Sequence, residues 1–401
     1  MIDLSKVQVD GPLEPFASGF AAELSAVGYT PGSVRCQLEL AAHLGRWLAA
    51  EGLGVVSLTA PVVERFLISR RAMGYRAFRS TKALVPLLTY LRRLGELPIE
   101  VAATPTPVEA LLARFRRYLI AERGLQIGTA RGYVDLVRPL VAGRATVDGV
   151  DVRGLTSGDV TSFLVAESRR LAPKTVQRLA TALRSLLRFW YLDGALDVSL
   201  VGSVPKVAYR SPGLPRGLDP SGVVALLSSC DRDRPDGLRD FGILTLLARM
   251  GLRSGEVAVL QLDDIDWRHG EITLRGKGNR RDLLPLPTDV GEAIVDYLHH
   301  GRPSDAMDRR VFIRTKAPNR GLTTGGITQA VAAAGRRAGL GTLYANRLRH
   351  TAATSMLKAG APLAEIGQVL RHRRPITTAI YAKVDTESLR PLARPWPAGL
   401  S

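Results

Sequence analysis

Residues 111–196 repeat the sequence pattern of residues 14–97, and this internal repeat restricts the fold of the chain more than any other feature. Both stretches carry apolar residues at three- and four-residue spacing, the pattern of amphipathic helices. Matching positions keep an offset of 96 to 99 residues: Gly32-Ser33-Val34-Arg35 with Gly128-Thr129-Ala130-Arg131, Leu58-Thr59 with Leu155-Thr156, Phe66-Leu67 with Phe163-Leu164, and Leu87-Leu88 with Leu186-Leu187. The repeat predicts two copies of one small helical domain.

Threonine and proline mark the expected helix starts and the boundary between the copies. Thr30 precedes Pro31, and Thr59 precedes Ala60-Pro61, so each threonine stands where a first helical turn would begin. The proline-rich segment 104–107 joins the two copies. We therefore predict a first helical domain at residues 1–103 and a second, duplicate domain at 104–203.

The composition changes after the second copy. Prolines at 205, 212, 215 and 220 alternate with basic residues, which indicates an extended basic linker over 204–220. Residues 221–385 then form a third predicted domain, with two strand-like runs, 271–274 and 282–286, on either side of a basic turn. Its predicted helices are 221–229, 238–250, 289–299, 326–338, 348–359 and 363–370, with Tyr381 on a short helix and a tail at 386–401. The predicted fold class is mostly α with a small antiparallel β element.

Charge and cysteine content narrow the class of protein. The chain has 401 residues, a formal net charge of +18 and a pI near 10.5, which favours a polyanionic partner such as nucleic acid. Cys36 and Cys230 are far apart and match no zinc-ligand spacing, so neither a disulfide framework nor a metal site is expected. We find no signal-peptide pattern and no apolar run of membrane-spanning length. These features predict a soluble, cytoplasmic protein.

The third predicted domain carries the side chains that phosphodiester chemistry without a metal requires. Arginine offers a planar charged fork for two phosphate oxygens, histidine a hydrogen bond or a proton, and tyrosine a hydroxyl that can become a covalent nucleophile. Glu256 follows Arg253 by three residues and can orient it on one helical face. The candidates are Arg253, Glu256, Lys277, Asn346, Arg349, His350, His372 and Tyr381.

In this order and spacing, these residues resemble the catalytic domain of the tyrosine recombinase, or phage integrase, family. The resemblance covers about residues 215–385, and the second helical copy resembles the family's SAM-like core-binding domain. It implies two tandem helical DNA-binding domains followed by a mixed α/β catalytic domain, which together form a C-shaped clamp on duplex DNA.

The resemblance also implies a role for each catalytic candidate. Arg253 and Arg349 would hold the scissile phosphate, and Tyr381 would attack phosphorus to leave a 3′-phosphotyrosine and a free 5′-hydroxyl. Lys277 would protonate the departing 5′-oxygen, and His372 would hydrogen-bond the phosphate. The phosphotyrosine keeps the energy of the broken bond, so neither ATP nor a metal cofactor is expected.

Asn346 departs from the family pattern, which usually has histidine or lysine three residues before the second arginine. Asparagine can accept or donate a hydrogen bond, but it cannot take the proton of the tyrosine. Either no base is needed here, or His350 or a water molecule serves instead. Asn346, His350 and Glu256 therefore stand as possible catalytic or supporting residues.

The expected partner is double-stranded DNA with specific recombination sites. By the resemblance, a homo-tetramer would bind two sites and exchange strands through a Holliday junction. The setting stays open between phage integration, transposition, conjugative-element movement and chromosome-dimer resolution. Accessory or directionality factors are possible partners, a membrane is not expected, and the protein would associate with the nucleoid. The tail at 386–401 would either dock on a neighbouring subunit or remain disordered. The candidate DNA-binding residues are Lys174, Arg178, Arg184, Lys206, Arg210, Arg280 and Arg281.

Two other functions remain open at this point. A type IB topoisomerase uses the same tyrosine chemistry without pairing two sites, but the helical repeat and the tail argue against it. A DNA-binding regulator with impaired catalysis is suggested by Asn346 alone. The presence of Arg253, Lys277, Arg349, His372 and Tyr381 argues against that loss.

Overall fold

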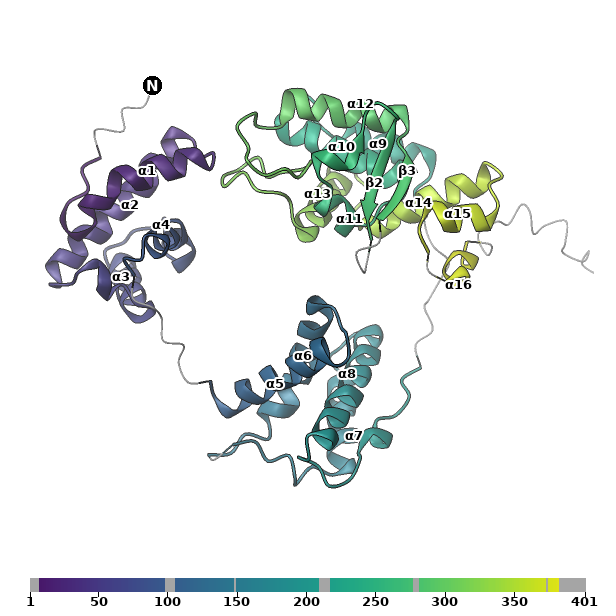
Figure 1. Ribbon diagram of the computed structural model, residues 1–401, viewed down its shortest axis with the longest axis horizontal. Helices are drawn as coiled ribbons and strands as arrows, with labels where there is room; N and C mark the ends of the chain where they lie inside the picture. Colours follow the sequence, from purple (N-terminus) through teal and green to yellow (C-terminus); the bar gives the residue numbers. More distant parts are fainter. Residues whose placement is uncertain are drawn as a thin grey trace, which may run out of the picture. The chain divides into compact units, whose positions relative to one another are not determined.

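The computed structural model describes residues 7–97, 105–147, 149–208, 217–276, 281–372 and 374–381 (Figure 1). Its described residues form two compact units, one made of residues 105–208 and the other of residues 7–97 with 217–381. Within the described residues, three large hydrophobic clusters lie in residues 9–97, 112–204 and 226–348.

Residues 7–97 fold into four α-helices that bury their apolar faces against one another. Thr30 begins the second helix, where its hydroxyl oxygen accepts a hydrogen bond from the backbone N–H of Ser33 at 3.3 Å. Phe20 and Phe66 lie at the centre of the core, each at most 1% exposed. The helices are α1 (Ala17–Ala26), α2 (Pro31–Ala50), α3 (Ala60–Ala72) and α4 (Thr81–Arg93).

Residues 105–208 also fold into four α-helices. They are α5 (Pro107–Ala121), α6 (Ile127–Ala142), α7 (Ser157–Ser168) and α8 (Pro173–Leu192). Thr156 caps α7 by accepting from the N–H of Asp159, whose carboxylate accepts from the N–H of Thr156 in return. Matching positions of the repeat are buried in both copies: Val34 and Ala130, Leu58 and Leu155, Leu67 and Leu164, Leu87 and Leu186.

The third domain is built around one central helix, α10 (Pro235–Met250), which is buried on most of its circumference. It packs against α9, α12, α13 and α14 (Figure 1). The surrounding helices are α9 (Pro220–Ser228), α11 (Ser254–Val259), α12 (Thr288–Asp296), α13 (Thr324–Arg337), α14 (Ala345–Lys358), α15 (Leu363–Val369) and α16 (Pro375–Ala379).

A three-stranded antiparallel sheet in the order β1-β2-β3 lies beside these helices. The strands are β1 (Ile265–Asp266), β2 (Glu271–Arg275) and β3 (Arg281–Pro285). Ile272 pairs with Ile265 on one side and with Leu284 on the other, and it is fully buried. The predicted hairpin of β2 and β3 is confirmed, whereas β1 was not predicted. The predicted turn between β2 and β3 lies mostly outside the described residues, since 277–280 are not among them.

Two predicted helices differ from the structure. The helix predicted over 289–299 ends earlier, because α12 stops at Asp296 and a π-helical turn follows from Tyr297 to Gly301. Tyr381 was predicted on a short helix, but α16 ends at Ala379 and Tyr381 lies just beyond it. The C-terminal tail predicted at 386–401 lies outside the described residues.

None of the described helices combines the length and the apolar character that crossing a membrane requires. Within the same residues, no group of three or more histidine, cysteine, aspartate or glutamate side chains is placed to hold a metal ion.

Candidate active site

A glycine turn after the central helix α10 brings Arg253 to the site. Gly251 ends α10 with a φ of 61°, a left-handed conformation that glycine adopts without strain. The turn is also tightly packed, because a Cβ at this position would lie 2.6 Å from Cδ2 of Leu370. The Gly251 carbonyl accepts a hydrogen bond from Nη1 of Arg349 at 2.5 Å. This turn therefore links α10, α14 and the segment after α15.

Glu256 holds two arginines in place. Its carboxylate accepts from Nη1 of Arg253 at 2.7 Å, from the backbone N–H of Arg253 at 2.8 Å, and from Nη2 of Arg371 at 2.6 Å. Burial alone would raise the pKa of Glu256, but the charge of Arg371 and the bonds from Arg253 outweigh it and lower that pKa. Glu256 is thus a buried anion between two cations. The Arg253 side chain that it holds is still 45% exposed.

Arg371 is a member of this cluster that sequence reasoning missed. Its side chain is 7% exposed and its φ is 54°, a conformation that costs an ordinary residue about 1 to 2 kcal/mol. The ion pair with Glu256 and a bond from Nη1 to the carbonyl of Val369 at 3.0 Å hold it there. Adjacency to His372 was the one signal in the sequence, because no helix or strand pattern covers this position.

Arg349 lies at the centre of the site and is 6% exposed. Its guanidinium donates to the backbone carbonyls of Gly251 and Leu370, so its orientation is determined by two separate segments. Burial, together with the nearby charge of Arg253, lowers the pKa of Arg349 to about 10. It therefore remains a cation at neutral pH, with guanidinium N–H groups left for an anion.

Tyr381 and His350 are in direct contact. The Tyr381 oxygen Oη lies 2.9 Å from Nδ1 of His350, and Tyr381 is 1% exposed. Burial raises the pKa of the Tyr381 hydroxyl, and the charge of Arg349 offsets part of that rise. Burial and Arg349 lower the pKa of His350, which keeps the imidazole neutral at pH 7. A neutral imidazole beside a protonated phenol is a pair between which a proton can pass.

His372 also lies beside Tyr381. Its ring is nearly parallel to the tyrosine ring, with 6° between their planes and 6.5 Å between centroids. Its Nδ1 lies 2.7 Å from the hydroxyl oxygen of Thr378. Burial and the charges of Arg349, Arg253 and Arg371 lower the pKa of His372 to about 4. His372 is therefore neutral at physiological pH.

Among the described residues, Asn346 takes no part in the hydrogen bonds around Tyr381. It lies in the first turn of α14 and is exposed, whereas Arg349 and His350 on the following turn face the site. The structure thus brings together six of the eight predicted candidates: Arg253, Glu256, Arg349, His350, His372 and Tyr381. Lys277, the seventh, lies outside the described residues.

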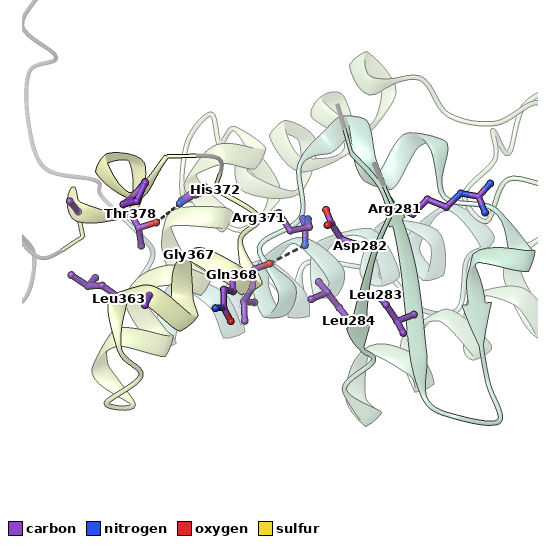
Figure 2. Close-up of a pocket in the computed structure, with 14 residues that line it drawn as sticks. Arg281, Asp282, Leu283, Leu284, Leu363, Gly367, Gln368, Arg371, His372 and Thr378 are labelled. Carbon is purple, nitrogen blue, oxygen red and sulfur yellow. Dashed lines mark hydrogen bonds between the residues drawn. The ribbon is translucent and has the colours of Figure 1, made fainter. Parts of the chain in front are cut away.

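A cavity of about 1060 Å³ opens beside the site, between β3 and the helices α15 and α16. Figure 2 shows Arg371 and His372 on its wall, with Arg281 on the strand opposite. The same view shows the bonds from Arg371 to Val369 and between His372 and Thr378. The cavity is therefore lined by the side chains of Arg371 and His372, from the loop between α15 and α16, and by the strand that follows the predicted Lys277 turn.

The predicted DNA-binding residues fall into three groups. Lys174 and Arg178 are exposed on α8, and Lys206 and Arg281 are exposed as well. Arg184 is engaged within its own domain, because its Nη2 donates to the carbonyls of Val204 and Pro205 at 3.1 and 2.8 Å. Arg210 and Arg280 lie outside the described residues.

Comparison with known proteins gives concordant results. Residues 216–388 match the Phage integrase family, and residues 112–194 match the Phage integrase, N-terminal SAM-like domain. The protein y4rA of Sinorhizobium fredii, whose name places it among integrases and recombinases, is 40% identical over 97% of this chain and 95% of its own length.

Two further comparisons each cover more than two thirds of the chain. The tyrosine recombinase XerD of Listeria monocytogenes is 31% identical over 68% of this chain and 94% of its own length. The crystal structure of a lambda integrase tetramer bound to a Holliday junction has a TM-score of 0.53, with 14% identity over 77% of this chain and 87% of that one. At that identity, the structural likeness establishes the fold.

Proposed function

Because the chain belongs to the phage integrase family of tyrosine recombinases, we propose that Tyr381 is the nucleophile with which this site-specific DNA recombinase cuts and rejoins strands. The observation that carries the proposal is the contact between the Tyr381 hydroxyl and Nδ1 of His350, directly beside the buried cation Arg349. A tyrosine with a neutral proton acceptor and fixed arginines around it has what attack on a phosphodiester requires.

The first step transfers one proton and exchanges one bond at phosphorus. Tyr381 Oη bonds to phosphorus as its proton passes to Nδ1 of His350, and the bond from phosphorus to the 5′-oxygen breaks. The 5′-oxygen leaves as a hydroxyl after gaining a proton, the role proposed for Lys277. The products are a 3′-phosphotyrosine and a free 5′-hydroxyl. Rejoining runs the same exchange in reverse with the 5′-hydroxyl of another strand.

The arginines would act on the charge that builds on the phosphate. Arg349 has free N–H groups besides the two that bind carbonyls, and Arg253 is partly exposed while Glu256 fixes its base. Both can bind non-bridging oxygens in the transition state without reorganising. His372 is neutral, so it would act as a hydrogen-bond donor through the ring nitrogen that does not face Thr378.

Asn346 does not have to supply a base in this scheme. The base role falls to His350, which stands four residues later on α14. His350 was the alternative left open by the sequence, and its contact with Tyr381 favours it over a water molecule.

We extend the proposal to the assembly from the family resemblance. The helical domain at 104–203 and the catalytic domain at 221–385 would close as a C-shaped clamp on duplex DNA, with the linker 204–220 along the backbone. The lambda integrase tetramer on a Holliday junction supports a homo-tetramer that joins two specific sites. The proposed setting is the integration or transposition of a mobile element in the cytoplasm, at the nucleoid. We also propose that accessory factors take part and that the C-terminal tail docks on a neighbouring subunit.

A covalent-adduct assay tests the nucleophile. The protein is incubated with DNA that flanks its own gene, the mixture is quenched with SDS, and protein-linked DNA is measured for wild type and Tyr381→Phe. Tyr344→Phe is the matched control, because Tyr344 is 63% exposed and its side chain makes none of the hydrogen bonds found among the described residues of the site. We expect an adduct with wild type and Tyr344→Phe and none with Tyr381→Phe. An adduct that persists in Tyr381→Phe would refute the assignment.

A further inference from the structure

We propose that the first helical domain binds duplex DNA through a basic loop surface formed by Arg76, Arg79 and Lys82, between α3 and α4. The inference rests on the proposed function, because it takes the α7–α8 region of the second domain as its DNA-binding counterpart. The family matches begin at residue 112, so they assign nothing to this domain.

The two copies carry arginines at matching places in this region. Ser69-Arg70-Arg71 stands at the end of α3, and Ser168-Arg169-Arg170 stands at the end of α7. The same offset of 99 residues relates Arg79 to Arg178, which is exposed on α8 and is a candidate DNA-binding residue. Basic residues thus recur where the third helix of each copy passes into the fourth.

A buried arginine fixes the shape of the loop. Arg70 is 6% exposed, its guanidinium lies 4.1 Å from the ring centroid of Tyr75, and its Nε donates to the carbonyl of Ala77 at 3.3 Å. Its Nη1 contacts Nδ1 of His43, and burial together with the charge of Arg70 lowers the pKa of that imidazole, which suits it to accept. Arg70 thereby holds both the ring and the backbone of the loop.

Two more contacts complete the anchoring. Arg71 donates from Nη1 to the carbonyl of Arg79 at 3.4 Å and pairs with Glu64 through Nη2 at 2.5 Å. Phe78, with a φ of 54°, packs against the core of the first domain. The loop backbone is therefore tied to α2, α3 and the core, which reduces the entropy that would be lost when its side chains bind a partner.

The cations that point outward are left unpaired. Arg76, Arg79 and Lys82 are exposed, and no ion pair within residues 7–97 of the described chain involves them. By contrast, arginines elsewhere in this domain have carboxylate partners: Arg35 with Glu39, Arg65 with Glu51 and Arg93 with Glu23. A rigid loop with unpaired cations beside a partly exposed tyrosine suits the phosphate backbone of DNA.

A salt titration of the full-length protein tests the proposal. Binding to a labelled random-sequence duplex of about 40 base pairs is measured as salt is varied, for wild type and for the triple variant Arg76→Ser, Arg79→Ser, Lys82→Ser. Three phosphate contacts contribute about 2.7 to the slope of log affinity against log salt. Raising salt fourfold should therefore weaken wild-type binding about 40-fold more than it weakens binding by the variant.

A charge-matched control separates local contacts from the general field of the protein. The variant Arg35→Ser, Arg65→Ser, Arg93→Ser removes the same three charges from paired positions of the same domain. It should keep nearly the wild-type slope. An equal change in the two variants would overturn the proposal, because it would show a long-range effect of net charge.

A variant in the second domain keeps this outcome distinct from failure of the proposed function. Lys174→Ser with Arg178→Ser should also lower the slope. If it does so while the Arg76, Arg79, Lys82 variant binds as wild type, the first domain is not a DNA-binding module and the proposed function stands. If neither variant changes the slope, the DNA-binding surface assigned to the second domain fails together with the inference built on it.

Discussion

Replacing His350 with glutamine is expected to slow DNA cleavage strongly and to change its dependence on pH. Glutamine can still accept a hydrogen bond from the Tyr381 hydroxyl, but it cannot take the proton at neutral pH. The wild-type imidazole can take it, because burial and the charge of Arg349 lower the pKa of His350 and keep the ring neutral. The contact of 2.9 Å between Nδ1 and Oη needs no rearrangement for the transfer.

The acidity of the tyrosine sets the size of the effect. A phenol with the reference pKa of about 10 is ionised to roughly one part in 300 at a pH of about 7.5. Burial raises the pKa of Tyr381, so its unaided ionisation is rarer still. His350→Gln should therefore lose about 10²- to 10⁴-fold in cleavage rate, the range that a positioned general base contributes.

Single-turnover formation of the covalent adduct, measured from about pH 6 to about pH 9, separates proton transfer from other roles. The wild-type rate should be nearly constant over this range and fall only at lower pH, as His350 becomes protonated. The rate of His350→Gln should instead rise about tenfold per pH unit, because the tyrosine must lose its proton to solvent.

His372→Gln is the matched control. His372 contacts Thr378 and the ring of Tyr381 but not the Tyr381 hydroxyl, so this variant should be slower with the wild-type pH profile. A His350→Gln protein with a flat profile and a rate within about threefold of wild type would refute the base assignment, since a general base contributes at least about 10².

Two further predictions concern the residues that hold the site together. Glu256→Gln should destabilise the catalytic domain at neutral pH by about 3 kcal/mol, because it leaves buried Arg371 without its anion. Because folding lowers the pKa of Glu256, its ionised carboxylate contributes its full stabilisation above the unfolded pKa of about 4.3. That stabilisation is lost as pH falls through the folded pKa, so calorimetric melting curves of wild type and Glu256→Gln should converge in acid. Gly251→Ala should lower both stability and adduct formation, because its Cβ would lie 2.6 Å from Leu370 in addition to the cost of a left-handed alanine. Gly270→Ala is the control, because Gly270 also has a positive φ, of 65°, but no atom lies within 4 Å of the added Cβ. It should lower stability by about 1 to 2 kcal/mol and leave adduct formation unchanged. Equal effects of the two substitutions on adduct formation would contradict this reasoning.

The helices and the hairpin of this fold could be predicted from local patterns. The repeat, the apolar spacing and the Thr-Pro starts indicate α2 and α3, and alternation around a basic turn indicates β2 and β3. Strand β1 could not be predicted, because Ile265 and Asp266 are a strand only through pairing with β2. The π-helical turn at Tyr297 likewise depends on tertiary contact, since the Tyr297 hydroxyl accepts from the backbone N–H of Ile313.

The candidate site could be predicted as a set of residues but not as a set of contacts. The order and spacing of Arg253, Arg349, His372 and Tyr381 point to them through the family pattern. Which histidine touches the tyrosine is decided by how the segment after α16 folds back onto α14, and no local rule gives that. Arg371 escaped prediction because an arginine at positive φ runs against backbone preference, and only its buried partner Glu256 explains it.

The burial of Tyr381 adds a condition to the reaction. A nucleophile must touch phosphorus, yet Tyr381 is 1% exposed and packs with Ala353, Ile366 and Leu370. Arg349 cannot move to meet the DNA without losing its bonds to the carbonyls of Gly251 and Leu370. The segment that carries Tyr381 is held more lightly, because α16 is five residues long and packs mainly on α15. Since the arginine is fixed from two sides, the tyrosine has to come to the phosphate, and Nδ1 of His350 has to stay within hydrogen-bond distance of the tyrosine hydroxyl as it does.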